Sequence, residues 1–139
     1  MNAAFAPHPP PRLSLETGAI GSAQLALYAA ASGDHNTLHL DEDSARASGF
    51  ERPVVHGMLS MACAARLFTS AFGAGSLQAL ETRFTGVALR GQRLRLDGQL
   101  NAIDGDLATY SVDARDETGQ PLMAGSATVR WRAMPPPGP

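Results

Sequence analysis

The hydrophobic pattern of the chain is helical in its first half. Short helices are predicted over 23–31, with Ser22 as N-cap and Gly33 as the end, and over 41–47, with acidic residues in its first turn. The longest helix is predicted over Gly57–Phe72. Its apolar stripe is Met58, Met61, Ala62, Ala65, Phe68 and Phe72, and Leu59, Cys63 and Leu67 make the other sides largely apolar. A helix that is apolar on most sides is expected to be surrounded by other elements.

The second half carries the alternation typical of half-buried β-strands. Strands are predicted over 77–85, 92–103, 107–117 and 121–132, with turns at 103–106 and 116–120. In the last three strands the expected inner residues are Leu94, Leu96, Leu100 and Ala102, then Ala108, Tyr110, Val112 and Ala114, then Met123, Ala127, Val129 and Trp131. Antiparallel strands after one long helix indicate an α+β fold in which a curved sheet wraps around that helix.

Both ends of the chain are rich in proline, which favours extended, solvated backbone. Residues 1–11 and 134–139 are therefore predicted to be disordered tails that can be removed with little loss of stability. The remaining residues, 12–133, are the length of one domain.

Composition excludes several classes of function. The formal net charge is −2, so nucleic acid is not expected as a partner. All 11 basic residues are Arg, which excludes a Schiff-base lysine. The one cysteine excludes an intrachain disulfide and a cysteine-based zinc cluster. The first residues lack the pattern of a secretory signal, and no apolar stretch reaches the length of a membrane span. A cytoplasmic protein without a membrane partner is expected.

The densest group of chemically active residues is the loop 32–39 (SGDHNTLH), between two helical segments. Asp34 and His39 can hold a water molecule and exchange protons with it. Asp and Asn after Gly also form turns and helix caps, so a purely structural role remains an alternative. Another alternative is a metal site made by Asp34, His39 and His56, which the sparse set of ligands does not favour.

A second group, 52–58 (RPVVHGM), opens the longest helix. The N–H of Gly57 is expected to point outward, unpaired, at the positive end of the helix dipole. Such a donor suits a developing oxyanion, although glycine also permits tight packing. Cys63 and the helix methionines are interpreted as core, and Arg93 and Arg95 as a solvated strand face.

Taken together, 28–41 (YAAASGDHNTLHLD) and 50–59 (FERPVVHGML) resemble the MaoC-like family, which includes (R)-specific enoyl-CoA hydratases and related acyl-thioester dehydratases. The resemblance implies a hot-dog fold and syn hydration of a trans-2-enoyl thioester, or the reverse dehydration. It implies Asp34 and His39 as the catalytic pair, and Asn36, His56 and Gly57 as substrate-binding residues. Asn36 supports the loop and its water, and the Gly57 amide is the oxyanion donor. No cofactor and no metal are implied.

The sequence departs from the family at two positions. Thr37 replaces a usual Pro, which is expected to loosen the loop, and Ala65 offers no hydroxyl where some members carry Ser. The partner implied is an acyl-CoA or acyl-carrier-protein thioester. A homodimer or an assembly of dimers is expected because a single sheet of this kind leaves open edges. The alternatives are a thioesterase on the same fold and a non-catalytic subunit that binds acyl thioesters.

Overall fold

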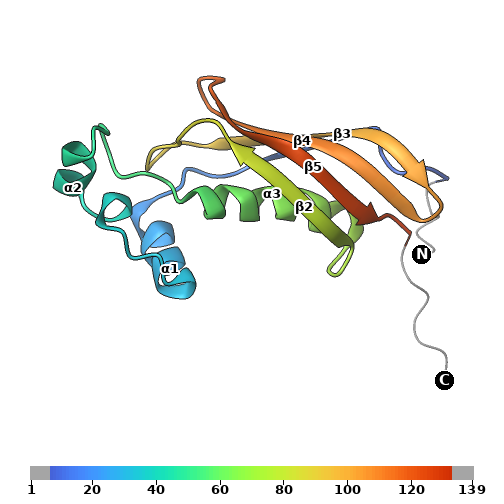
Figure 1. Ribbon diagram of the computed structural model, residues 1–139, viewed down its shortest axis with the longest axis horizontal. Helices are drawn as coiled ribbons and strands as arrows, with labels where there is room; N and C mark the ends of the chain where they lie inside the picture. Colours follow the sequence, from blue (N-terminus) through green and yellow to red (C-terminus); the bar gives the residue numbers. More distant parts are fainter. Residues whose placement is uncertain (1–6, 133–139) are drawn as a thin grey trace.

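Five antiparallel strands form one sheet in the order β1-β3-β4-β5-β2, and a long helix lies along one face of it (Figure 1). The computed structural model describes residues 7–132. Its strands are β1 (Arg12–Glu16), β2 (Leu77–Phe84), β3 (Leu94–Asp104), β4 (Leu107–Asp116) and β5 (Pro121–Arg130). Its helices are α1 (Ser22–Ser32), α2 (Glu42–Ala47), α3 (Gly57–Phe72) and the 3₁₀ turn η1 (Thr37–His39).

The core lies between α3 and the inner face of the sheet. The buried residues of α3 are Leu59, Ser60, Cys63, Ala64, Leu67 and Phe68. They pack with inner residues of β3, β4 and β5, including Leu94, Leu96, Tyr110, Val112, Met123 and Val129. This pairing of one helical stripe with period-two strand positions confirms the expected α+β fold and places Cys63 in the core, as predicted.

The side of α3 that faces away from the sheet is exposed, which corrects the predicted packing of this helix. Met58 is 56% exposed, and Ala62 and Arg66 are also exposed. The apolar stripe predicted from the sequence is therefore rotated about the helix axis relative to the stripe that is buried. The helix rests on the sheet and is not surrounded within this chain. Among the described residues, no helix is both long enough and apolar enough to cross a membrane.

The helix ends differ from the predictions only in detail. Ser22 is the first residue of α1 and Gly21 is its N-cap, so the capping role predicted for Ser22 is wrong. Gly33 ends the helix as expected, with φ of 77°, a left-handed conformation that glycine adopts without steric cost. Asp41 caps α2 by accepting a hydrogen bond from the Ser44 N–H.

The edge strand β1 was not predicted. It pairs antiparallel with β3, with Leu15 opposite Leu96, and places Leu13 and Leu15 against the core. The alternation of Leu13 and Leu15 with polar neighbours is a strand signal, but it covers only five residues beside a proline-rich run.

The prolines before β1 are attached to the domain, which corrects the predicted boundary at Arg12. Pro9 is buried. The carbonyl of Pro10 accepts a hydrogen bond from the Tyr110 hydroxyl at 2.7 Å, and that of Pro11 accepts one from the Leu100 N–H at 2.9 Å. These residues are part of the fold. Residues 1–6 and the predicted C-terminal tail lie outside the described residues.

Replacing Tyr110 with Phe tests this attachment. Because the variant loses a hydrogen bond that is partly buried, its free energy of unfolding is expected to fall by about 1 kcal/mol. Urea denaturation of both proteins measures the difference. Tyr28→Phe is the control and should change stability by less than about 0.5 kcal/mol. Equal stability of Tyr110→Phe and the parent would contradict the attachment.

Candidate active site

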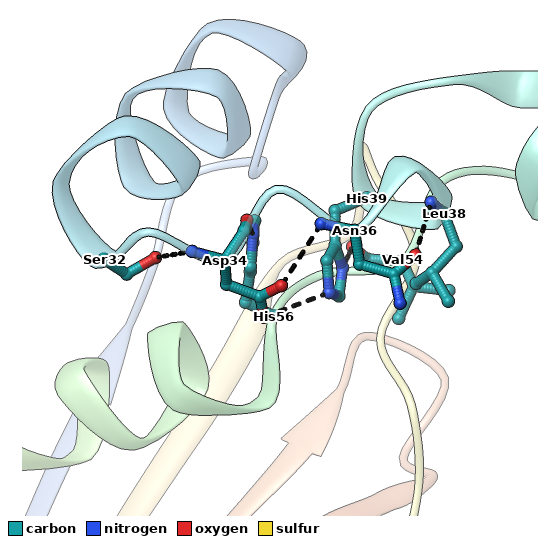
Figure 2. A network of polar contacts seen from close by, with 7 residues as sticks. All are labelled: Ser32, Asp34, Asn36, Leu38, His39, Val54 and His56. Carbon is teal, nitrogen blue, oxygen red and sulfur yellow. Dashed lines mark hydrogen bonds and ion pairs between the residues drawn. The ribbon is translucent and has the colours of Figure 1, made fainter.

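The loop between α1 and α2 is folded by its own side chains (Figure 2). Oδ1 of Asp34 accepts a hydrogen bond from the Asn36 N–H at 3.3 Å. Oδ1 of Asn36 then accepts one from the Leu38 N–H at 3.2 Å, which begins η1. These short-range bonds explain why Asp and Asn stand here. Thr37 is the first residue of η1, and its carbonyl accepts bonds from Leu40 and Asp41, so the loop is ordered without a proline.

His39 is held in one orientation at the end of η1. Its Nδ1 lies 2.7 Å from the carbonyl oxygen of Val54. A carbonyl only accepts, so Nδ1 carries the hydrogen and Nε2 of the neutral ring carries a lone pair. That Nε2 lies 3.5 Å from Oδ2 of Asp34, with the His39 side chain 11% exposed and that of Asp34 51% exposed (Figure 2).

The Asp34–His39 pair is arranged to hold a water molecule. With His39 neutral and Asp34 ionised, two acceptor atoms face each other at a distance too long for a direct hydrogen bond. One water molecule has two hydrogens and can donate one to each atom. The Oδ1 of Asp34 accepts from Asn36, and Oδ2 is the oxygen that faces Nε2 of His39. The pair can accept a proton from this water and return one to a substrate.

A cavity of about 160 Å³ opens beside this pair. His39, Gly57 and Ser60 are among its polar lining, and Phe84, Val87 and Leu122 are among its apolar walls. Gly57 is the first residue of α3, so its N–H has no acceptor within the helix, and no other acceptor is recorded for it among residues 7–132. A free N–H at the positive end of a 16-residue helix suits a developing oxyanion next to His39.

His56 supports the site from behind. It is 1% exposed, so its side chain offers almost no surface for the direct substrate contact expected from the sequence. Its Nε2 lies 3.2 Å from the backbone carbonyl of Asp34, and its ring stacks on that of His39 with centroids 3.8 Å apart. Burial, together with the nearby His39, lowers the pKa of His56, against a smaller opposing effect of Asp34. His56 is therefore neutral at pH 7.

The three side chains weighed as metal ligands do lie together. One ligand atom each of Asp34, His39 and His56 falls within 4.8 Å of the others. The two imidazole planes are stacked, however, with only 18° between them. A metal ion binds along the nitrogen lone pair, in the plane of the ring, and two nearly parallel stacked planes share no such point. One nitrogen of each ring is also bonded to a carbonyl. The geometry suits proton transfer and does not suit a shared metal ion.

The structure thus places Asp34 beside His39, and His39 beside Gly57 in the lining of the cavity, whereas Asp34 is not itself a lining residue. Asn36 is the N-cap of η1. Sequence reasoning missed Ser60 and Phe84. Ser60 follows Gly57 by less than one helical turn, so its place near the start of the helix could have been predicted from the sequence. Phe84 comes from β2 and could not be placed without the fold. A larger depression, about 710 Å³, lies on the outer face of the sheet, where exposed residues such as Arg95 and Asp113 line it and no comparable acid–base pair is present.

A family model described as "MaoC like domain" matches residues 6–119, so the chain belongs to the MaoC-like family. Among solved structures, the (R)-hydratase from A. caviae involved in PHA biosynthesis superimposes with a TM-score of 0.81 and 28% identity, covering 87% of this chain and 94% of that one. The antiparallel sheet, the helix α3 and this likeness confirm the hot-dog fold expected from the sequence.

Two curated relatives share the sequence over shorter stretches. The peroxisomal multifunctional enzyme type 2 of Drosophila melanogaster is 32% identical over 106 residues, which is 74% of this chain and 17% of that protein. The (R)-specific enoyl-CoA hydratase of Aeromonas caviae is 56% identical over 39 residues, 28% of this chain and 29% of that protein. The matched segments therefore span less than a third of either relative.

Proposed function

We propose that this chain hydrates trans-2-enoyl thioesters to (R)-3-hydroxyacyl thioesters, or catalyses the reverse dehydration. The observation that carries the proposal is the Asp34–His39 pair, with Oδ2 and Nε2 at 3.5 Å, in which His39 shares the lining of one cavity with Gly57 at the start of α3. The relatives named as (R)-specific hydratases support the reaction class and its stereochemistry.

In the proposed reaction each step is assigned to Asp34, His39 or Gly57. The oxygen of the bound water bonds to C3 of the enoyl group, and one of its protons passes to Asp34 or His39. The electrons of the double bond move toward the thioester carbonyl, where the Gly57 N–H stabilises the negative charge. The pair then delivers one proton to C2, so that the net change is the addition of one water. Because one acid–base pair both activates the water and returns the proton, the two new bonds form on the same face of the double bond, so the addition is syn.

The substrate is an acyl thioester carried by coenzyme A or by an acyl carrier protein. In this proposal its thioester oxygen binds at Gly57 and its C2 and C3 bind beside His39, in the cavity that Val87 and Leu122 also line. No residue of the pair requires a cofactor for this chemistry, since water is both the nucleophile and the source of the added proton.

The direct test follows the absorbance of an enoyl thioester with a panel of acyl lengths on both carriers. Loss of the conjugated double bond without release of free thiol is expected. Release of thiol would instead identify a thioesterase, and binding without turnover would identify a non-catalytic subunit. Either result would overturn the proposal.

We further propose that the chain is a homodimer or an assembly of dimers. The outer side of β2 pairs with no other strand of residues 7–132, and edge strands are normally covered. Three large apolar side chains close to this edge and to the site are about half exposed: Met58 at 56%, Phe84 at 46% and Val87 at 43%. A second copy would bury them. Light scattering of the purified protein should give at least twice the mass of the chain, and a monomer at micromolar concentration would contradict the proposal.

A further inference from the structure

His56 is the buried group for which the reaction just described has no use. Its ring contacts two others. It is stacked on that of His39, with 18° between the planes, and it meets the ring of Tyr28 edge-on with centroids 4.8 Å apart. Its Nε2 must carry the hydrogen, because the atom it faces is the backbone carbonyl of Asp34. Its Nδ1 is buried and has no hydrogen-bond partner.

We infer that His56 is a positioning residue that fixes both members of the catalytic pair at once, through its ring face for His39 and its Nε2–H for Asp34. The inference rests on the proposed function for its kinetic consequence. Asp34 and His39 are five positions apart in a loop, so their side chains need a contact outside the loop to keep a fixed separation. His56 is the residue directly before α3, so it gives the two side chains a fixed contact on a rigid element.

The ring face of His56 determines how His39 can turn. The Nδ1–H of His39 is bonded to Val54, which leaves the ring free to swing about that bond unless something covers its face. His56 covers it at 3.8 Å. A neutral ring is needed for this role, because a charged one would repel His39 whenever His39 holds a proton. The ionisable groups that face His56 are His39, Asp34 and Tyr28, and burial keeps His56 uncharged beside them.

The hydrogen bond from Nε2 acts on Asp34 through the backbone. It ties the backbone carbonyl of Asp34 to His56, the residue directly before α3. The start of one helix therefore positions both the carboxylate of Asp34 and the N–H of Gly57. The Nδ1 of His56 has no partner, which is consistent with this assignment. The ring leaves this nitrogen unpaired while its Nε2–H stays bonded to the carbonyl of Asp34.

Two substitutions separate these contacts. His56→Phe keeps an aromatic face for His39 and removes the donor to Asp34. His56→Gln keeps an amide donor and removes the ring. Each is expected to lower kcat by at least about 10-fold with KM changed less than about 3-fold, because neither contact involves the substrate. The pH profile of kcat should move only in His56→Gln, where His39 becomes accessible to water. Tyr28→Phe, which keeps its ring, is the control and should match the parent.

A spectroscopic measurement on the same proteins does not depend on activity. Long-range ¹⁵N–¹H correlation spectra of the parent should show His39 protonated on Nδ1, and His56 neutral and protonated on Nε2, at pH 7. His39 should keep its signature in His56→Phe and become a mixture of both tautomers in His56→Gln. These spectra test the inference even if the parent hydrates no enoyl thioester, in which case only the proposed function fails.

Three results would overturn the inference. Parental kcat and pH profile in both variants would mean that His56 only fills space. A raised KM at unchanged kcat would mean that it binds substrate. A charged His56, or one protonated on Nδ1, in the parent at pH 7 would contradict the contacts themselves, and this result needs no variant to fold.

Discussion

Asp34→Asn and His39→Ala are each expected to lower the kcat of enoyl-thioester hydration by at least about 100-fold. The Asn side chain keeps the oxygen that accepts from Asn36 and loses the charge of the oxygen that faces His39. His39→Ala removes the Nε2 lone pair. Steady-state kinetics measure both effects, and thermal melting should show that both variants fold, since Asp34 is half exposed and packs little.

The double variant should be far less than multiplicatively worse than either single one, because both groups act on one water molecule. His35→Ala and Asp43→Asn are matched controls. His35 is an exposed residue of the same loop, and Asp43 has a side chain that is 95% exposed. Both controls should retain the parental rate. A collapse of stability in both Asp34→Asn and His39→Ala would instead favour a purely structural role for the pair.

Gly57→Val is expected to lower the rate by about 100- to 1,000-fold, the usual cost of losing one oxyanion donor. A Cβ on Gly57 would lie 3.3 Å from the ring of Phe84. That ring is 46% exposed and can move aside, so the protein should fold. The added side chain and the displaced ring would then occupy the cavity in front of the N–H.

Two other substitutions calibrate this prediction. Gly57→Ala adds only the Cβ and should give an intermediate loss. Gly18→Val is the matched control, because a Cβ on Gly18 meets nothing within 4 Å, and it should leave the rate unchanged. Near-parental turnover by folded Gly57→Val would remove the oxyanion role from this amide.

The sequence predicts the helices α1–α3 and the strands β2–β5 within two residues at each end, and it misses β1 and η1. The strong periodicity of 57–72 and of the last three strands places α3, β3, β4 and β5 within a few residues. The strand β1 was missed because its five-residue pattern is short and its pairing with β3 joins positions 79 to 87 residues apart, which local pattern cannot reveal. The attachment of Pro10 and Pro11 was missed for the same reason, since it depends on Tyr110 and Leu100.

The sequence indicated which residues belong to the candidate site. It did not indicate how they are arranged in space. The resemblance of 28–41 and 50–59 to the MaoC-like family implied Asp34, His39 and Gly57 as site residues, whereas their spacing alone left a structural role open. Burial of His56 and its stack on His39 could not be foreseen, because a histidine beside a helix start is compatible with either exposure or burial. The role of Phe84 depends on β2 lying beside the start of α3, which only the folded chain establishes.

The most direct measurement compares the parent with Asp34→Asn in a single assay, the loss of enoyl-thioester absorbance on hydration, with the product resolved by chirality. The parent is expected to form the (R)-3-hydroxyacyl thioester, and folded Asp34→Asn is expected to form it at least about 100-fold more slowly. A parent that forms the (S) product, or a folded Asp34→Asn that hydrates at the parental rate, would contradict the proposed function.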